Sequence, residues 1–212
     1  MGRTESQTYP DEISFEIIVR PRMNKSELRK IYLEKQKSLS DLECSEKSGQ
    51  IIGLFFQSFD MSDVHILHSF LPIRRYNEID THLILEKLWR DFPQIETVVP
   101  RVNLDTNEIE NLKFTHETEL VLSNWQINEP SHNEIVEIEK IDMVLVPLLC
   151  FDESGHRVGY GKGFYDRFLT KCRPDTQKIG LSYFPPVKEI TDADSFDIRL
   201  DLCLTPEKVW RF

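Results

Sequence analysis

The chain has 212 residues, a net charge of −10, 40% hydrophobic residues and 29% charged residues, which is typical of a globular protein with one substantial core. The negative charge argues against a general nucleic-acid binder, because such proteins need a basic excess to neutralise phosphates. No apolar run reaches the length of a membrane span, and residues 1–22 lack the apolar core of a secretory signal.

The cysteines and histidines predict neither a metal centre nor a disulfide framework. The four cysteines are widely spaced without a C-x-x-C pair, and the six histidines show no metal-ligand spacing. We therefore expect a reducing, cytoplasmic setting. The cysteines are Cys44, Cys150, Cys172 and Cys203.

The composition divides the chain into an extension, residues 1–22, which we expect to be flexible, and one domain, residues 23–212. Asn24 and Glu27 form a capping-box pattern that predicts the start of a first helix. Ser40 and Glu43 repeat the pattern and predict the start of a second helix.

Strand and helix patterns alternate through the rest of the domain. Apolar runs predict strands at 64–71, 96–99, 112–115, 143–150, 179–183 and 200–204, and helical spacing predicts helices at 80–89 and 164–171. This alternation favours a single α/β domain with a mainly parallel sheet and helices on both faces, in a Rossmann-like three-layer arrangement. Ligands in such folds bind at the carboxyl ends of the strands.

Four of the eight glycines fall within nine residues: Gly155, Gly159, Gly161 and Gly163. They lie between the predicted strand at 143–150 and the predicted helix at 164–171, where backbone N–H groups and a helix N-terminus can bind phosphate. Arg157 and Lys162 add two cations. The spacing matches neither a Walker A loop nor a dinucleotide fingerprint, and the alternative is a plain strand-to-helix turn.

The string GHRVGYGKGFYDRFL at 155–169 resembles the signature of the 5-formyltetrahydrofolate cyclo-ligase family. Shorter pieces are similar to other elements of that family in the same order. They are KSELR at 25–29, NEIDT at 77–81, VPR at 99–101, WQINEP at 125–130 and DIRLD at 197–201. The resemblance covers about residues 23–204.

The resemblance implies an enzyme that uses ATP and Mg²⁺ to convert 5-formyltetrahydrofolate into 5,10-methenyltetrahydrofolate, releasing ADP and phosphate. Phosphorylation of the formyl oxygen would make it a leaving group, and a neighbouring folate nitrogen would then attack. Such a path asks the protein for positioning and charge stabilisation. We expect the protein to act on these small molecules as a monomer, without a nucleic-acid or membrane partner.

The resemblance also implies roles for individual residues. Those for ATP are Lys25, Arg29, Arg157, Val158, Gly159, Tyr160, Gly161, Lys162, Gly163, Phe164 and Tyr165. Those for the folate are Leu71, Glu78, Trp125, Tyr160, Gly161, Lys162, Gly163 and Phe164. The catalytic residues would be Lys162, Arg157 and Tyr165, and the Mg²⁺ ligands Asp166 and Asp197.

Each assignment has a structural alternative. Lys25 and Arg29 share one helix face, which could instead be an ordinary solvent-exposed basic face. Asp166 suits the first turn of any helix, and Glu78 suits a surface loop. Leu71, Trp125 and Phe164 are equally compatible with the core, and Tyr165 with a half-buried site. Asp192, Asp194 and Asp201 compete with Asp197 as the metal ligand.

Two other functions compete with the folate cyclo-ligase. One is a different phosphotransferase, or a thioester-type transferase, on the same α/β framework. The other is a catalytically silent protein that binds folate or a nucleotide. The presence of Lys25, Arg29, Arg157, Lys162 and Asp166 together argues against the silent protein, because a degenerate relative tends to lose charged site residues.

Overall fold

The computed structural model describes residues 22–103, 105–106, 108–123 and 127–212. Within these residues the chain forms four α-helices: α1 (Lys25–Lys37), α2 (Asp41–Ser58), α3 (His82–Asp91) and α4 (Phe164–Lys171). Two short 3-10 helices, η1 (Arg74–Tyr76) and η2 (Ile138–Lys140), lie between them. In the described part of the chain, no helix combines the length and the apolar character that a membrane crossing needs.

A seven-stranded mixed sheet forms the centre of the domain, in the order β13-β12-β10-β7-β2-β3-β4. The five inner strands run parallel, and the two edge strands, β4 and β13, run antiparallel to their neighbours. The strands are β2 (Ile66–His68), β3 (Glu96–Asn103), β4 (Glu108–Lys113), β7 (Met143–Pro147), β10 (Gln177–Leu181), β12 (Leu202–Leu204) and β13 (Val209–Arg211). The predicted α/β class with a mainly parallel sheet is confirmed, and the Rossmann-like classification stays a prediction.

Three short strand pairs lie outside this sheet. They are β1 (Arg22–Met23) with β11 (Glu189–Ile190), β5 (Leu120–Leu122) with β6 (Asn128–Pro130), and β8 (Cys150–Phe151) with β9 (Arg157–Val158). The predicted single strand at 143–150 is therefore wrong in its extent. β7 ends at Pro147, where proline offers no N–H for further pairing, and Cys150 begins the β8–β9 hairpin.

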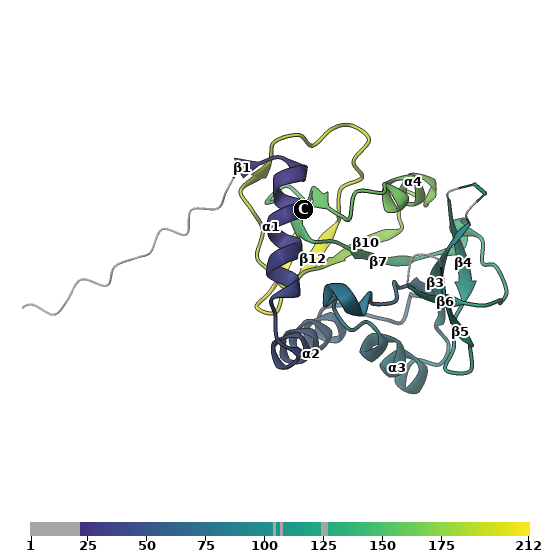
Figure 1. Ribbon diagram of the computed structural model, residues 1–212. Helices are drawn as coiled ribbons and strands as arrows, with labels where there is room; N and C mark the ends of the chain where they lie inside the picture. The colour runs from purple at the N-terminus through teal and green to yellow at the C-terminus, as the bar shows by residue number, and fades with distance from the viewer. Residues whose placement is uncertain (1–21, 104, 107, 124–126) are drawn as a thin grey trace, which may run out of the picture.

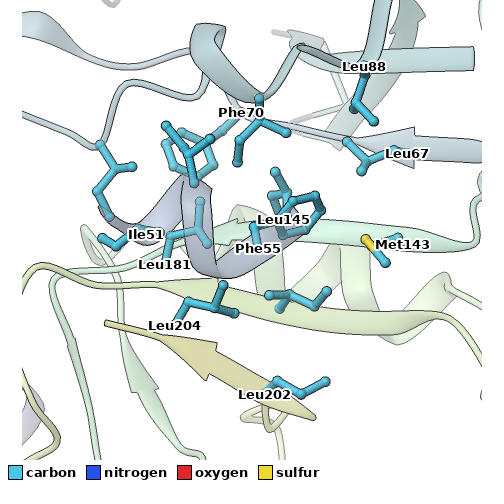
Figure 2. Close-up of a cluster of buried hydrophobic side chains, with 14 of the residues drawn as sticks. Ile51, Phe55, Leu67, Phe70, Leu88, Met143, Leu145, Leu181, Leu202 and Leu204 are labelled. Atoms are coloured by element: carbon cyan, nitrogen blue, oxygen red, sulfur yellow. The ribbon is translucent and has the colours of Figure 1, made fainter. Parts of the chain in front are cut away.

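Side chains alternate between the two faces of the sheet and build a core on each. Met143 and Leu145 of β7 pack with Phe55 of α2 on one face (Figure 2), whereas Val144 of the same strand packs with Phe168 of α4 on the other. Figure 1 shows α2 and α3 below the sheet and α4 above it. This confirms the predicted helices on both faces.

The first two helices begin where the capping boxes predict. The backbone N–H of Glu27 donates to the Asn24 side chain at 2.9 Å, and the Glu27 carboxylate accepts from the Asn24 N–H at 3.1 Å. Ser40 and Glu43 form the equivalent box at α2. The capping box fixes the residue at which α1 begins and therefore the face of the helix on which Arg29 lies.

The α1 helix packs against the β8–β9 hairpin. Leu28 and Tyr32 of α1 share a buried cluster with Cys150 and Val158 of the hairpin. This packing brings Arg29 next to the segment that follows β9, although 130 residues separate it from Gly159 in the sequence.

Candidate active site

The candidate phosphate loop is shorter than the glycine spacing suggests. Gly155 lies in the turn of the β8–β9 hairpin, where a Cβ would come within 2.7 Å of the Phe212 ring. The Asp152 carboxylate closes this turn by accepting N–H groups of Ser154 and His156. Only the segment from Gly159 to Gly163 leads into α4, and it follows β9 rather than the long strand β7.

Two glycines of this loop need the left-handed backbone conformation. Gly161 has φ +87°, and Gly163, the N-cap of α4, has φ +67°. A Cβ on Gly161 would lie 3.0 Å from the Arg29 guanidinium, whose Nε donates to the Gly159 carbonyl at 3.0 Å. Arg29 therefore contacts the loop directly, and its predicted role in binding phosphate stays a prediction.

Arg157 is buried, with 7% of its surface exposed, and its guanidinium has partners within the protein. One nitrogen donates to Asp166 Oδ1 at 2.7 Å and the other to the Ile198 carbonyl. Burial lowers the pKa of Arg157, and the carboxylates of Asp166 and Asp197 oppose that shift. Both predicted metal ligands therefore lie close to one buried cation.

The aspartate cluster divides into two groups. Asp197 accepts from Lys25 Nζ with both oxygens, at 2.7 and 2.5 Å, and Asp192 accepts the Lys25 backbone N–H. Asp194 lies 3.9 Å from the same ammonium group. Asp201 instead binds Lys178 at the amino ends of the strands β10 and β12, which separates it from the loop.

Glu78 lies in the turn after β2 and faces the glycine loop. Its carboxylate accepts the Ile73 N–H at 2.7 Å and hydrogen-bonds the hydroxyl of Tyr160. Burial raises the pKa of Glu78 to about 7, and the two hydrogen bonds only partly offset it. The structure thus brings Glu78, the predicted folate contact, to Tyr160 of the predicted phosphate loop, which the sequence could place only at the same sheet edge.

Tyr165, in the first turn of α4, is one of the few buried polar groups among the described residues that lack a hydrogen-bond partner. Burial raises its pKa strongly; the Glu78 carboxylate adds to that shift and the Arg157 guanidinium opposes it. Tyr165 also lies edge-on to the His68 ring, with ring centroids 5.9 Å apart. Both Glu78 and Arg157 therefore act electrostatically on the Tyr165 hydroxyl.

The other predicted residues are distributed unevenly. Lys162 is exposed on the loop, and Val158 is buried beneath it. Phe164 is half-buried under the guanidinium of Arg167, 5.2 Å from the ring centroid. Leu71 packs in a buried cluster with Leu85, Val99 and Phe114, as its structural alternative predicts. Trp125 lies outside the described residues.

Two polar residues that the sequence analysis does not single out organise the site. Gln36 is 4% exposed and donates to the Tyr76 carbonyl at 2.7 Å and to the Tyr160 hydroxyl at 3.3 Å. Asn77, at φ +53°, donates to the carbonyl of Leu39 at 3.0 Å. A signal exists for Gln36, because it continues the buried face of α1 at i+4 from Tyr32.

Comparison with known proteins identifies the family of the chain. A family model described as the 5-formyltetrahydrofolate cyclo-ligase family matches residues 21–206. The chain belongs to this family of enzymes. Both the predicted family and the predicted enzyme are therefore confirmed.

Relatives of the cyclo-ligase family match most of the chain. The 5-formyltetrahydrofolate cyclo-ligase of Escherichia coli K12 is 31% identical over 138 residues, which cover 64% of this chain and 75% of the relative. The Mycoplasma genitalium protein of the same name is 30% identical over 188 residues, covering 86% and 98%. The NMR structure of Aquifex aeolicus 5,10-methenyltetrahydrofolate synthetase matches with 30% identity and a TM-score of 0.75, covering 88% of this chain and 92% of that one.

Proposed function

We propose that this member of the family catalyses the ATP-dependent cyclisation of 5-formyltetrahydrofolate to 5,10-methenyltetrahydrofolate, with release of ADP and phosphate. The observation that carries the proposal is the Tyr160 hydroxyl, which hydrogen-bonds Glu78 while its backbone belongs to the glycine loop. A candidate phosphate-binding segment and a half-buried carboxylate suited to a reduced pterin are therefore in direct contact. The printed names of the relatives supply the folate substrate and product.

The phosphate side of the site combines three sources of positive potential. The loop from Gly159 to Gly163 presents backbone N–H groups, and α4 begins directly after it. Arg29 lies against the loop, and Lys25, the first residue of α1, pairs with Asp197 and would have to exchange that partner for a phosphate. Lys162 adds an exposed cation on the loop itself. These groups favour a compact polyanion in a protein whose net charge is −10.

Asp166 and Asp197 would supply the carboxylates that hold a magnesium ion. Asp166 accepts from the Arg157 guanidinium at 2.7 Å, and Asp197, which pairs with Lys25, acts electrostatically on the same guanidinium. The described residues contain no cluster of three or more metal-ligating side chains, and Mg²⁺ commonly uses one or two carboxylates together with substrate phosphates and water. Bound there, the ion would offset the charge of the phosphates.

The chemistry follows from the substrate. A formyl oxygen on nitrogen is a poor leaving group, and transfer of the γ-phosphoryl group of ATP turns it into a phosphate ester. The neighbouring folate amine then attacks the formyl carbon, and phosphate leaves with the former formyl oxygen. Lys162 and Arg157 would stabilise the charge that develops on the transferred group, and Tyr165 would orient the formyl region.

The test follows the methenyl product by its absorbance while a second assay measures ADP. We expect product and ADP in equal amounts when ATP, Mg²⁺ and 5-formyltetrahydrofolate are all present, and neither when ATP is omitted. ADP formed without the methenyl product would indicate another phosphotransferase. Folate or nucleotide binding without turnover would indicate the silent protein.

A further inference from the structure

Ring closure leaves one proton to be removed. When the folate amine attacks the formyl carbon, a C–N bond forms and the bond from that carbon to the phosphorylated oxygen breaks, with its electron pair leaving on phosphate. The attacking amine begins as N–H and ends within the methenyl bridge, so its proton must pass to an acceptor. A positioned side chain that accepts such a proton typically contributes about 10²–10⁴ in rate.

We propose that Glu78 is the general base that takes this proton onto its carboxylate. The inference rests on the proposed function and adds a chemical role to a residue that the sequence predicts only as a binding contact. Three structural observations support it: how the carboxylate is held, what lies beside it, and which charges face it.

The carboxylate is fixed from two sides. One oxygen, Oε2, accepts the backbone N–H of Ile73 at 2.7 Å, and the Tyr160 hydroxyl is its side-chain partner. Gln36, buried in α1, places that hydroxyl by donating to it at 3.3 Å and fixes the turn by donating to the Tyr76 carbonyl at 2.7 Å. Two hydrogen bonds leave further lone pairs of the carboxylate available to a substrate N–H.

The buried hydroxyl of Tyr165 marks where a polar ligand atom belongs. It has no hydrogen-bond partner among the described residues, and leaving a buried hydroxyl unpaired is costly. Glu78 and Arg157 both act electrostatically on this hydroxyl, with opposite signs. In this proposal the formyl group of the substrate meets Tyr165, the phosphoryl region lies toward Arg157, and the amine lies toward Glu78.

The protonation state of Glu78 suits a base near neutral pH. Burial raises its pKa to about 7, so a substantial fraction is ionised at pH 7. The titratable groups that face it are Tyr160 and Tyr165, whose pKa values burial raises above the usual 10, and beyond them Arg157. These three groups keep one charge state between pH 5 and 9. Among the described groups around this carboxylate, Glu78 is therefore the one that titrates in that range.

The experiment measures kcat and kcat/KM for the folate against pH, by ADP release, in the wild-type protein and three variants. We expect wild-type kcat/KM to fall below about pH 7 as Glu78 takes up a proton. Glu78→Gln should lose at least about 100-fold in kcat and should lose the acid limb of the profile. Glu78→Asp should keep the limb with a smaller loss, because it retains a carboxylate.

Tyr160→Phe provides the sharpest comparison, because it keeps the base and removes only the hydroxyl that hydrogen-bonds it. That hydrogen bond lowers the pKa of Glu78, so its loss should move the acid limb to higher pH. Circular dichroism of each variant checks folding. A Glu78→Gln protein that is folded and keeps wild-type kcat with a raised KM overturns the inference and leaves the proposed function intact. A wild-type protein that makes no methenyl product overturns both.

Discussion

The ammonium group of Lys25 lies 2.7 and 2.5 Å from the two carboxylate oxygens of Asp197. The sequence assigns these residues to opposite partners, the lysine to the phosphates of ATP and the aspartate to Mg²⁺. In the structure each neutralises the other, and Asp166 and Arg157 form a second pair of the same kind at 2.7 Å. Binding of a magnesium–nucleotide complex would exchange both sets of partners.

Asp197→Asn should therefore affect ATP binding differently without and with Mg²⁺. We expect ATP alone to bind more tightly, by about 1 kcal/mol, because Lys25 no longer has a charged competitor for the phosphates. The gain in affinity that Mg²⁺ provides should shrink. Calorimetric titrations with and without Mg²⁺ measure both quantities. Asp201→Asn is the matched control, because Asp201 pairs with Lys178 away from the loop; equal behaviour of the two variants would contradict the assignment.

Alanine substitutions of Arg157 and Lys162 should differ in their effect on stability. Sequence alone predicts that both alanine variants lose ATP use with little loss of stability. Arg157 is buried, whereas the side chain of its partner Asp166 is 39% exposed, so removal of Arg157 should also lower the free energy of unfolding, by about 2 kcal/mol. Exposed Lys162→Ala should cost under about 0.5 kcal/mol of stability but about 1.5–3 kcal/mol of ATP binding. Urea unfolding and ATP titration decide, and unchanged ATP affinity in Lys162→Ala would remove it from the site.

Gly161→Ala and Gly159→Ala form a matched pair within the loop. At Gly161 the backbone is left-handed and an added Cβ meets the Arg29 guanidinium, so we expect a loss of about 1–2 kcal/mol in unfolding free energy. At Gly159 an added Cβ meets nothing within 4 Å, so stability should stay unchanged. Thermal unfolding of both variants is the measurement, and similar midpoints would show that the loop conformation adapts.

Glu78→Gln should stabilise the fold more at pH 8 than at pH 5. In the folded protein the pKa of Glu78 is about 7, against an ordinary 4.5, so between these values the folded state binds more protons than the unfolded state. Its stability therefore falls as pH rises through this window. The variant does not titrate there and keeps its stability. Its unfolding free energy relative to wild type should therefore rise by roughly 1–2 kcal/mol from pH 5 to pH 8, a value reduced because the Glu78 side chain is only half-buried. Urea unfolding at both pH values tests the difference.

The boundary of the domain can be tested by two deletions. Residues 1–20 precede the family match, and we expect their removal to leave activity and the unfolding midpoint unchanged. Sequence alone extends this tolerance to residue 22. Arg22 and Met23, however, pair with Glu189 and Ile190, next to the loop that carries Asp192 and Asp197. Deletion through Met23 should lower both stability and ATP affinity; equal results from the two deletions would make β1 dispensable.

Sequence alone predicts the features that depend on neighbouring residues. The starts of α1 and α2 follow from capping boxes that span four residues, and α4 begins at the glycine that ends the loop. The parallel inner strands follow from continuous apolar runs, because a strand buried on both faces has no polar positions. The glycine string also identifies the family, since so many residue types at fixed spacing rarely recur together.

The tertiary structure decides everything that depends on distant contacts. It splits 143–150 into a strand and a hairpin, assigns Gly155 to that hairpin and sends Asp201 to the other end of the sheet. It brings Lys25 to Asp197 across 172 residues and joins Gln36, Tyr160 and Glu78 from three separate segments. No local pattern encodes these pairings, because burial and charge partners exist only once distant segments of the chain pack together. The pKa of Glu78, on which its chemistry depends, is a property of that packing.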